Sequence, residues 1–193
     1  MTFAADTVIA ETRAWVDRAV IGLNLCPFAR AVQVKNQIRY TVSGATDPDA
    51  LLAILREELH LLAGAAPERV ETTLLIHPCV LTSFLDFNDF LGEADAAVEE
   101  LGYAGVLQVA SFHPQYQFAG TAADDVTNAT NRSPYPTLHL LREESIDRAV
   151  AAFPEARTIY ERNLRTLQAL GPQGWEALQA QCRSDAAHAE DED

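Results

Sequence analysis

The feature that most constrains the fold is a long connection between two short apolar runs in the second half of the chain. Residues 105–112 and 137–141 are rich in β-forming side chains and predict strands, while the segment between them has no regular periodicity. Connections of this length inside a compact domain are uncommon and usually carry function or are disordered. Histidine, arginine and several aromatic residues occur in this one, which disordered segments rarely show. We therefore expect the functional surface to lie here.

Elsewhere the apolar residues follow helical or alternating spacing. The pattern predicts helices over residues 4–23, 46–63, 83–101, 143–153, 155–170 and 174–182, and further strands over 37–43 and 72–76. Alternating helices and strands favour right-handed crossovers between parallel strands. The predicted fold is α/β or α+β: a small two-layer sandwich of three to four mostly parallel strands with about five helices.

Length and charge predict one acidic domain. The chain has 193 residues with 48% hydrophobic content, which suffices for one core but not for two. Its net charge of -14 disfavours a nucleic-acid partner. Residues 184–193 contain acidic side chains and neither Lys nor Arg, so we expect a disordered acidic tail after a globular domain over residues 1–183.

Cysteine usage and hydropathy predict the compartment. The three cysteines have no framework spacing, which is typical of a reducing environment. The first residues do not resemble a signal peptide, and no apolar stretch is long enough to span a membrane. We expect a cytoplasmic protein with no membrane partner; the sequence does not define its oligomeric state.

Two histidines occupy equivalent positions. His77 and His113 each follow a predicted strand and precede a proline. If these strands are neighbours, both imidazoles lie at the carboxyl edge of the sheet, within reach of each other or of a metal. His139 alternates with Leu138 and Leu140, so it is either an exposed strand residue or a pocket wall. The three histidines form a candidate set for a transition metal such as Zn or Fe; the alternative is that each satisfies local backbone groups.

Cys26 lies where a predicted helix ends before Pro27. It is a candidate nucleophile or metal ligand if a cation, a histidine or a metal lowers the pKa of its thiol. Arg30 and Arg39 are the candidate cations nearby in sequence. The alternative is a small buried apolar side chain. Structural zinc sites normally show Cys-x-x-Cys or paired histidine spacing, and this chain has neither.

The long connection contains a polar cluster around Arg132. With Asn131 it offers planar donors that suit a carboxylate or phosphate group. Tyr135, Tyr116 and Arg39 complete the candidate substrate-binding set, whose expected ligand is a small, anionic molecule. The alternative is an Ω-like loop packed on its own aromatic residues, with Arg132 in a structural ion pair.

Several unusual strings resemble one family. They include Leu-Cys-Pro-Phe, Asp-Phe-Asn-Asp-Phe, Ser-Phe-His-Pro and Asn-Arg-Ser-Pro-Tyr-Pro-Thr, and they fall in residues 15–29, 85–91, 110–114, 116–121 and 131–143. The chain resembles the bacterial domain-of-unknown-function family 1415 over roughly residues 8–171. This resemblance implies no activity, cofactor, substrate or catalytic residue.

Two hypotheses follow. In the first, the protein is a small-molecule enzyme in which Cys26, His113 and His77 are catalytic, in a pocket under the long loop, with metal dependence left open. In the second, the same loop forms a non-catalytic module that binds a metabolite or another protein. The residues alone do not decide between these two classes.

Overall fold

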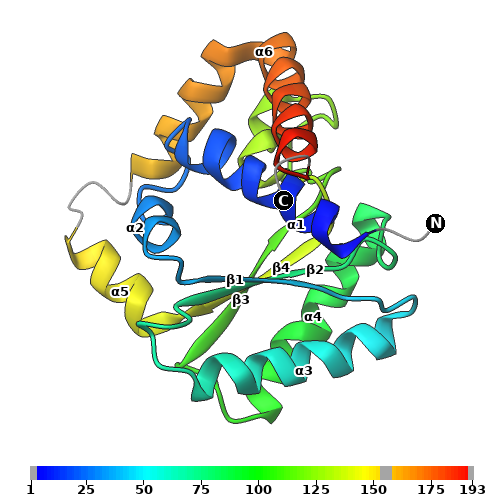
Figure 1. Ribbon diagram of the computed structural model, residues 1–193, viewed down its shortest axis with the longest axis vertical. Helices are drawn as coiled ribbons and strands as arrows, with labels where there is room; N and C mark the ends of the chain where they lie inside the picture. Colours follow the sequence, from blue (N-terminus) through cyan, green and yellow to red (C-terminus); the bar gives the residue numbers. More distant parts are fainter. Residues whose placement is uncertain (1–3, 153–157, 191–193) are drawn as a thin grey trace.

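The computed structural model describes residues 4–152 and 158–190 (Figure 1). At its centre is a sheet of four strands: β1 (Ile38–Val42), β2 (Thr72–Ile76), β3 (Leu107–Phe112) and β4 (Thr137–Arg142). Their spatial order is β1-β2-β4-β3. β1 and β2 are parallel, whereas β4 is antiparallel to both β2 and β3. Three strands therefore run in one direction, and β4 runs against them.

The helices surround this sheet. They are α1 (Ala5–Trp15), which continues into the π-helical turn η1 (Val16–Ile21), then α2 (Ala29–Val34), α3 (Pro48–Gly64), α4 (Phe84–Glu100), the 3-10 helix η2 (Val126–Asn131), α5 (Glu143–Ala152) and α6 (Ile159–Glu190). Asp47 caps α3 by accepting a hydrogen bond from the Ala50 N–H, and Pro48 occupies the first turn. Within the described residues, none of these helices is both long and apolar enough to cross a membrane.

Both faces of the sheet are covered. Leu75 of β2 and Leu138 of β4 pack against α3 and α4, while Leu74 and Ile76 belong to a second core cluster with α1 and α6. Figure 1 shows α3 and α4 on one side of the strands and α1 and α6 on the other. All five residues of β2 are buried, as expected for a strand enclosed on both faces.

The mixed α/β class predicted from the sequence is confirmed. The predicted two-layer arrangement is corrected to three layers, because the N-terminal and C-terminal helices cover the second face. The strands were predicted to be mostly parallel, and three of the four do run in the same direction. β4 returns from the end of β3 and occupies the place between β2 and β3, so only β1 and β2 are parallel neighbours.

The C-terminal helix bends at the break that the sequence predicts. Gly171 has a φ of 70°, a conformation that glycine adopts without strain, and Pro172 begins the next helical segment. The chain then stays helical to Glu190, so the tail predicted to be disordered from residue 184 is helical over 184–190. Ala186 is buried against the rest of the protein, and Asp185 forms an ion pair with Arg18. Residues 153–157 and 191–193 of the predicted helices and tail lie outside the described residues.

The side-chain amide of one buried residue connects separate parts of residues 113–136, called here the 113–136 loop. Asn128 is fully buried. Its Oδ1 accepts hydrogen bonds from the Phe118 N–H at 3.0 Å and the Thr121 hydroxyl at 2.8 Å, and its Nδ2 donates to the Ala122 carbonyl at 2.8 Å. Backbone polar groups that would otherwise lose water on folding are thereby paired.

Replacing Asn128 by alanine should destabilise the protein by about 1–3 kcal/mol, because it leaves buried donors and acceptors without partners. Urea denaturation followed by circular dichroism measures this change. The matched control is Gln117→Ala, which removes an exposed amide that donates to Thr121 in the same loop. Equal losses for the two variants would contradict a special role for the buried amide.

Candidate functional site

His77 and His113 lie at the same end of the sheet, on the face covered by α3 and α4. Their strands are not neighbours, since β4 separates β2 from β3. Both imidazoles nevertheless pack on the ring of Phe87 from α4, with ring centroids 5.6 Å away for His77 and 5.1 Å for His113. Both side chains are fully buried.

The hydrogen bonds of these two histidines are local. His77 Nδ1 donates to the Val80 carbonyl at 3.0 Å, and its buried Nε2 has no hydrogen-bond partner in the described part of the chain. His113 Nε2 donates to the Leu81 carbonyl at 3.2 Å, while its Nδ1 accepts from the Gln115 N–H at 3.0 Å. Burial lowers the pKa of His77 to about 4 and also lowers the pKa of His113. Both imidazoles are therefore neutral near pH 7.

The structure does not assemble the predicted three-histidine metal set. His139 lies on the opposite face of the sheet, where its Nε2 donates to Thr72 Oγ1 at 2.8 Å and its ring packs near Phe112. Burial lowers its pKa to about 4. Among the described residues, no three or more His, Cys, Asp or Glu side chains are grouped to hold a metal ion. The alternation of side chains along β4 explains this separation.

Cys26 is also separate from His77 and His113. It follows η1 on the face covered by α1 and α6, where Asn163 of α6 donates to the neighbouring Leu25 carbonyl at 2.9 Å. Burial raises the pKa of the Cys26 thiol, and the nearby charge of Arg162 opposes this shift only in part. The predicted pocket of one thiol and two imidazoles is therefore not formed, because the sheet lies between them.

Two of the predicted substrate-binding residues have side chains that make structural contacts. Arg39 forms two hydrogen bonds to Glu58, at 2.8 and 2.9 Å, which tie β1 to α3. Tyr116 packs between Phe84 and Phe118, with both ring-centroid distances at 5.0 Å. Neither residue lines the cavity described below.

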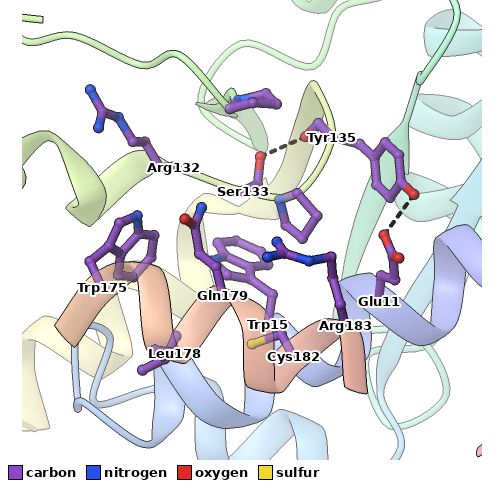
Figure 2. Close-up of a pocket in the computed structure, with 12 residues that line it drawn as sticks. Glu11, Trp15, Arg132, Ser133, Tyr135, Trp175, Leu178, Gln179, Cys182 and Arg183 are labelled. Carbon is purple, nitrogen blue, oxygen red and sulfur yellow. Dashed lines mark hydrogen bonds between the residues drawn. The ribbon is translucent and has the colours of Figure 1, made fainter. Parts of the chain in front are cut away.

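A cavity of about 180 Å³ opens between the 113–136 loop, α1 and α6 (Figure 2). We call it the loop–helix pocket. It is lined by Glu11, Trp15, Pro114, Arg132, Ser133, Pro134, Tyr135, Trp175, Leu178, Gln179, Cys182 and Arg183. Two predicted binding residues, Arg132 and Tyr135, are among them. Asn131 is not; its Nδ2 donates to the Ser111 carbonyl at 3.2 Å.

Arg132 and Tyr135 shape this pocket through contacts within the protein. Arg132 Nε donates to the Tyr116 carbonyl at 3.2 Å and its Nη2 donates to the Ala123 carbonyl. Figure 2 shows its guanidinium directed away from Glu11. The Tyr135 hydroxyl donates to Glu11 Oε2 at 2.7 Å, which ties the loop to α1. Burial and this carboxylate raise the pKa of Tyr135, so its hydroxyl keeps its proton.

The remaining lining residues give the pocket an apolar floor and a polar mouth. Trp15 and Trp175 are 4% and 5% exposed, and the buried Cys182 lies beside them. Burial raises the pKa of Cys182 to about 11, so its thiol is uncharged near neutral pH. Arg183 is exposed. Within residues 4–152 and 158–190, neither Arg183 nor Gln179 has a hydrogen bond or ion pair from its side chain.

Sequence reasoning missed the α6 side of the pocket. Trp175, Gln179, Cys182 and Arg183 follow helical spacing and therefore share one face of α6. That spacing was available in the sequence. Nothing in it indicates that this face meets the 113–136 loop, because the bend at Gly171 sets the direction of the second half of α6.

The fold and the loop–helix pocket define a mixed α/β protein in which a long loop and two helices form a cavity. The family model for the protein of unknown function DUF1415 matches residues 7–177. The chain therefore belongs to this family, as the sequence strings indicate. Comparison with curated proteins gave no match, and comparison with solved structures gave none either. The matched region contains Trp15, Trp175 and the whole 113–136 loop, while Gln179 and Arg183 follow it.

The buried neutral histidines predict a pH dependence of stability. The pKa of His77 is about 4 in the folded state and about 6.5 in an unfolded chain, so the unfolded state binds more protons between these values. Stability is complete above about pH 6.5 and is lost as the pH falls toward 4, by on the order of 3 kcal/mol for this residue.

His77→Asn should flatten that dependence, because the asparagine amide can still donate to Val80 but does not titrate. Urea denaturation at several pH values from about 4.5 to 7 measures the slope. The control is His188→Asn, which replaces an exposed histidine in the last turn of α6. A slope in His77→Asn as steep as in the unmodified protein would contradict the assignment.

Proposed function

We propose that the protein binds a small anionic molecule in the loop–helix pocket and does so without catalysis. The observation that carries this proposal is that Arg183, at the mouth of a cavity with two tryptophans in its floor, has no ion-pair partner among the described residues. Arg183 and Gln179 are the polar side chains free to meet a ligand there, within the described part of the chain. Pockets of this kind combine an apolar body with a few polar groups that orient the ligand.

Arg183 has no acidic partner among the described residues, although acidic residues outnumber Lys and Arg by 28 to 14 in the whole chain. The acidic residue in the pocket lining, Glu11, already accepts a hydrogen bond from the Tyr135 hydroxyl. An anionic ligand would give Arg183 the charge-assisted hydrogen bonds that the protein itself does not supply.

The non-catalytic alternative is favoured over the enzyme for chemical reasons. A nucleophilic cysteine needs a lowered pKa, and burial raises the pKa of both Cys26 and Cys182. His77 and His113 use their protonated nitrogens to bond backbone carbonyls, and neither lines the pocket. We therefore assign a structural role to these cysteines and histidines and the binding role to the loop–helix pocket. We expect the protein to act in the cytoplasm.

Arg183→Gln should weaken anion binding by about tenfold or more, since a hydrogen bond to a charged group contributes about 1.5–3 kcal/mol. The measurement is ligand-induced thermal stabilisation against a panel of small carboxylates and phosphates, each paired with its neutral amide or alcohol. Bound anions stabilise the folded state by mass action.

The matched control is Arg165→Gln on the same helix. Arg165 is 68% exposed, makes only a long 3.9 Å ion pair with Glu161 and does not line the pocket. The Arg165→Gln variant should bind anions as tightly as the unmodified protein does. If no anion in the panel stabilises the protein, or if both variants lose binding equally, the proposed function is wrong.

A further inference from the structure

We infer that the ligand is a small aromatic monocarboxylate, whose single ring lies on the tryptophan floor and whose carboxylate meets Arg183. This inference rests on the proposed function and specifies its ligand. It combines the size of the cavity, the chemistry of its floor and the number of charges at its mouth. Each of these restricts the ligand independently.

The volume limits the ligand to about one ring. The loop–helix pocket measures about 180 Å³. An apolar cavity of roughly 150 Å³ in another protein holds one benzene molecule. A six-membered ring with one small polar substituent therefore fills the space, whereas a nucleotide or a drug-sized molecule needs a pocket of about 300 Å³ or more.

The floor favours an aromatic ring over a flexible chain. Trp15 and Trp175 are nearly completely buried, and Leu178 and Cys182 add apolar surface between them. Pro114 and Pro134 of the loop line the same cavity. Aromatic pairs gain about 0.5–1.5 kcal/mol beyond the burial of their surface, and a rigid ring loses little conformational entropy on binding.

The charges favour one carboxylate. Arg183 provides a planar fork that suits two carboxylate oxygens. The second arginine in the lining, Arg132, already uses its Nε and Nη2 on the Tyr116 and Ala123 carbonyls, so fewer of its N–H groups can meet a second anionic group. Glu11 lines the pocket on the side of Tyr135, where it would repel another carboxylate (Figure 2). A phosphate dianion or a dicarboxylate is therefore a poorer match.

The chain itself contains the reporter for a test. It has two tryptophans and both line the pocket, so fluorescence excited selectively at tryptophan, and not at the five tyrosines, reports on this site. Fluorescence titration of the full chain with benzoate, cyclohexanecarboxylate, benzamide, acetate and inorganic phosphate compares ring, aromaticity and charge one at a time. Benzoate should bind about tenfold or more tightly than benzamide, acetate and phosphate, and about two- to tenfold more tightly than cyclohexanecarboxylate.

Calorimetric titration of three variants separates the contribution of the tryptophan floor to binding from that of Arg183 at the mouth. Trp175→Leu should lose the preference for benzoate over acetate and keep binding acetate, whereas Trp175→Phe should retain the preference because it keeps a ring. Arg183→Gln should weaken benzoate and acetate alike. The phenylalanine variant guards against a loss that reflects only poorer folding of a buried site.

The outcomes distinguish the two levels of the proposal. If anions bind through Arg183 but benzoate binds no better than acetate or phosphate, the ligand inference is wrong and the proposed function stands. Equal binding of cyclohexanecarboxylate and benzoate would also overturn it, since the floor would then select for apolar bulk and not for an aromatic ring. If none of the anions binds, the proposed function itself is wrong.

Discussion

The buried amide of Asn128 is the interaction on which the binding surface depends. It joins the first half of the 113–136 loop to the 3-10 turn in its second half through three hydrogen bonds. The ends of this loop are fixed as well: His77 donates its backbone N–H to the Pro136 carbonyl, and His113 donates its backbone N–H to the Asn131 carbonyl. The segment that carries Arg132 and Tyr135 therefore keeps one position against α1 and α6.

This arrangement explains why the conspicuous histidines have structural contacts. His113 lies where β3 meets the 113–136 loop, His77 lies where β2 meets the segment before α4, and both are buried against Phe87. Each imidazole bonds the backbone of residues 80–81, the segment between β2 and α4. Such contacts organise the end of the sheet, while the cavity opens on the far side, against α1 and α6. Burial disfavours the charged form of both imidazoles. A proton on His113 Nδ1 would remove the acceptor of the Gln115 N–H, and a proton on the buried His77 Nε2 would place a charge in the core.

Sequence periodicity could predict the elements and the importance of the loop, because both are local properties of the chain. The Asp47 cap of α3, the break at Gly171, and the places of Arg132 and Tyr135 in the loop were all accessible in this way. The side of the sheet on which each element packs could not be predicted from these local patterns. Cys26 was grouped with His77 and His113, but α1 crosses the opposite face, so its end lies near α6.

The position of β4 was equally inaccessible, and it decides the layout of the site. A strand that follows β3 could have paired at several edges, and its insertion beside β2 depends on long-range burial of Leu138 and Leu140. The pocket residues on the second half of α6 lie directly before the acidic segment 184–193. Their role depends on packing of Cys182 and Ala186 against the rest of the protein, which no local pattern reveals.

We propose that small anions bind between the 113–136 loop, α1 and α6, and not at the histidines. The most direct measurement is a titration of ¹⁵N-labelled protein with benzoate, followed by the indole N–H signals of Trp15 and Trp175 and the imidazole signals of His77 and His113. We expect both indole signals to shift and to saturate at one common benzoate concentration, while the imidazole signals stay in place. Saturable shifts of the imidazole signals with unmoved indole signals would contradict the proposal.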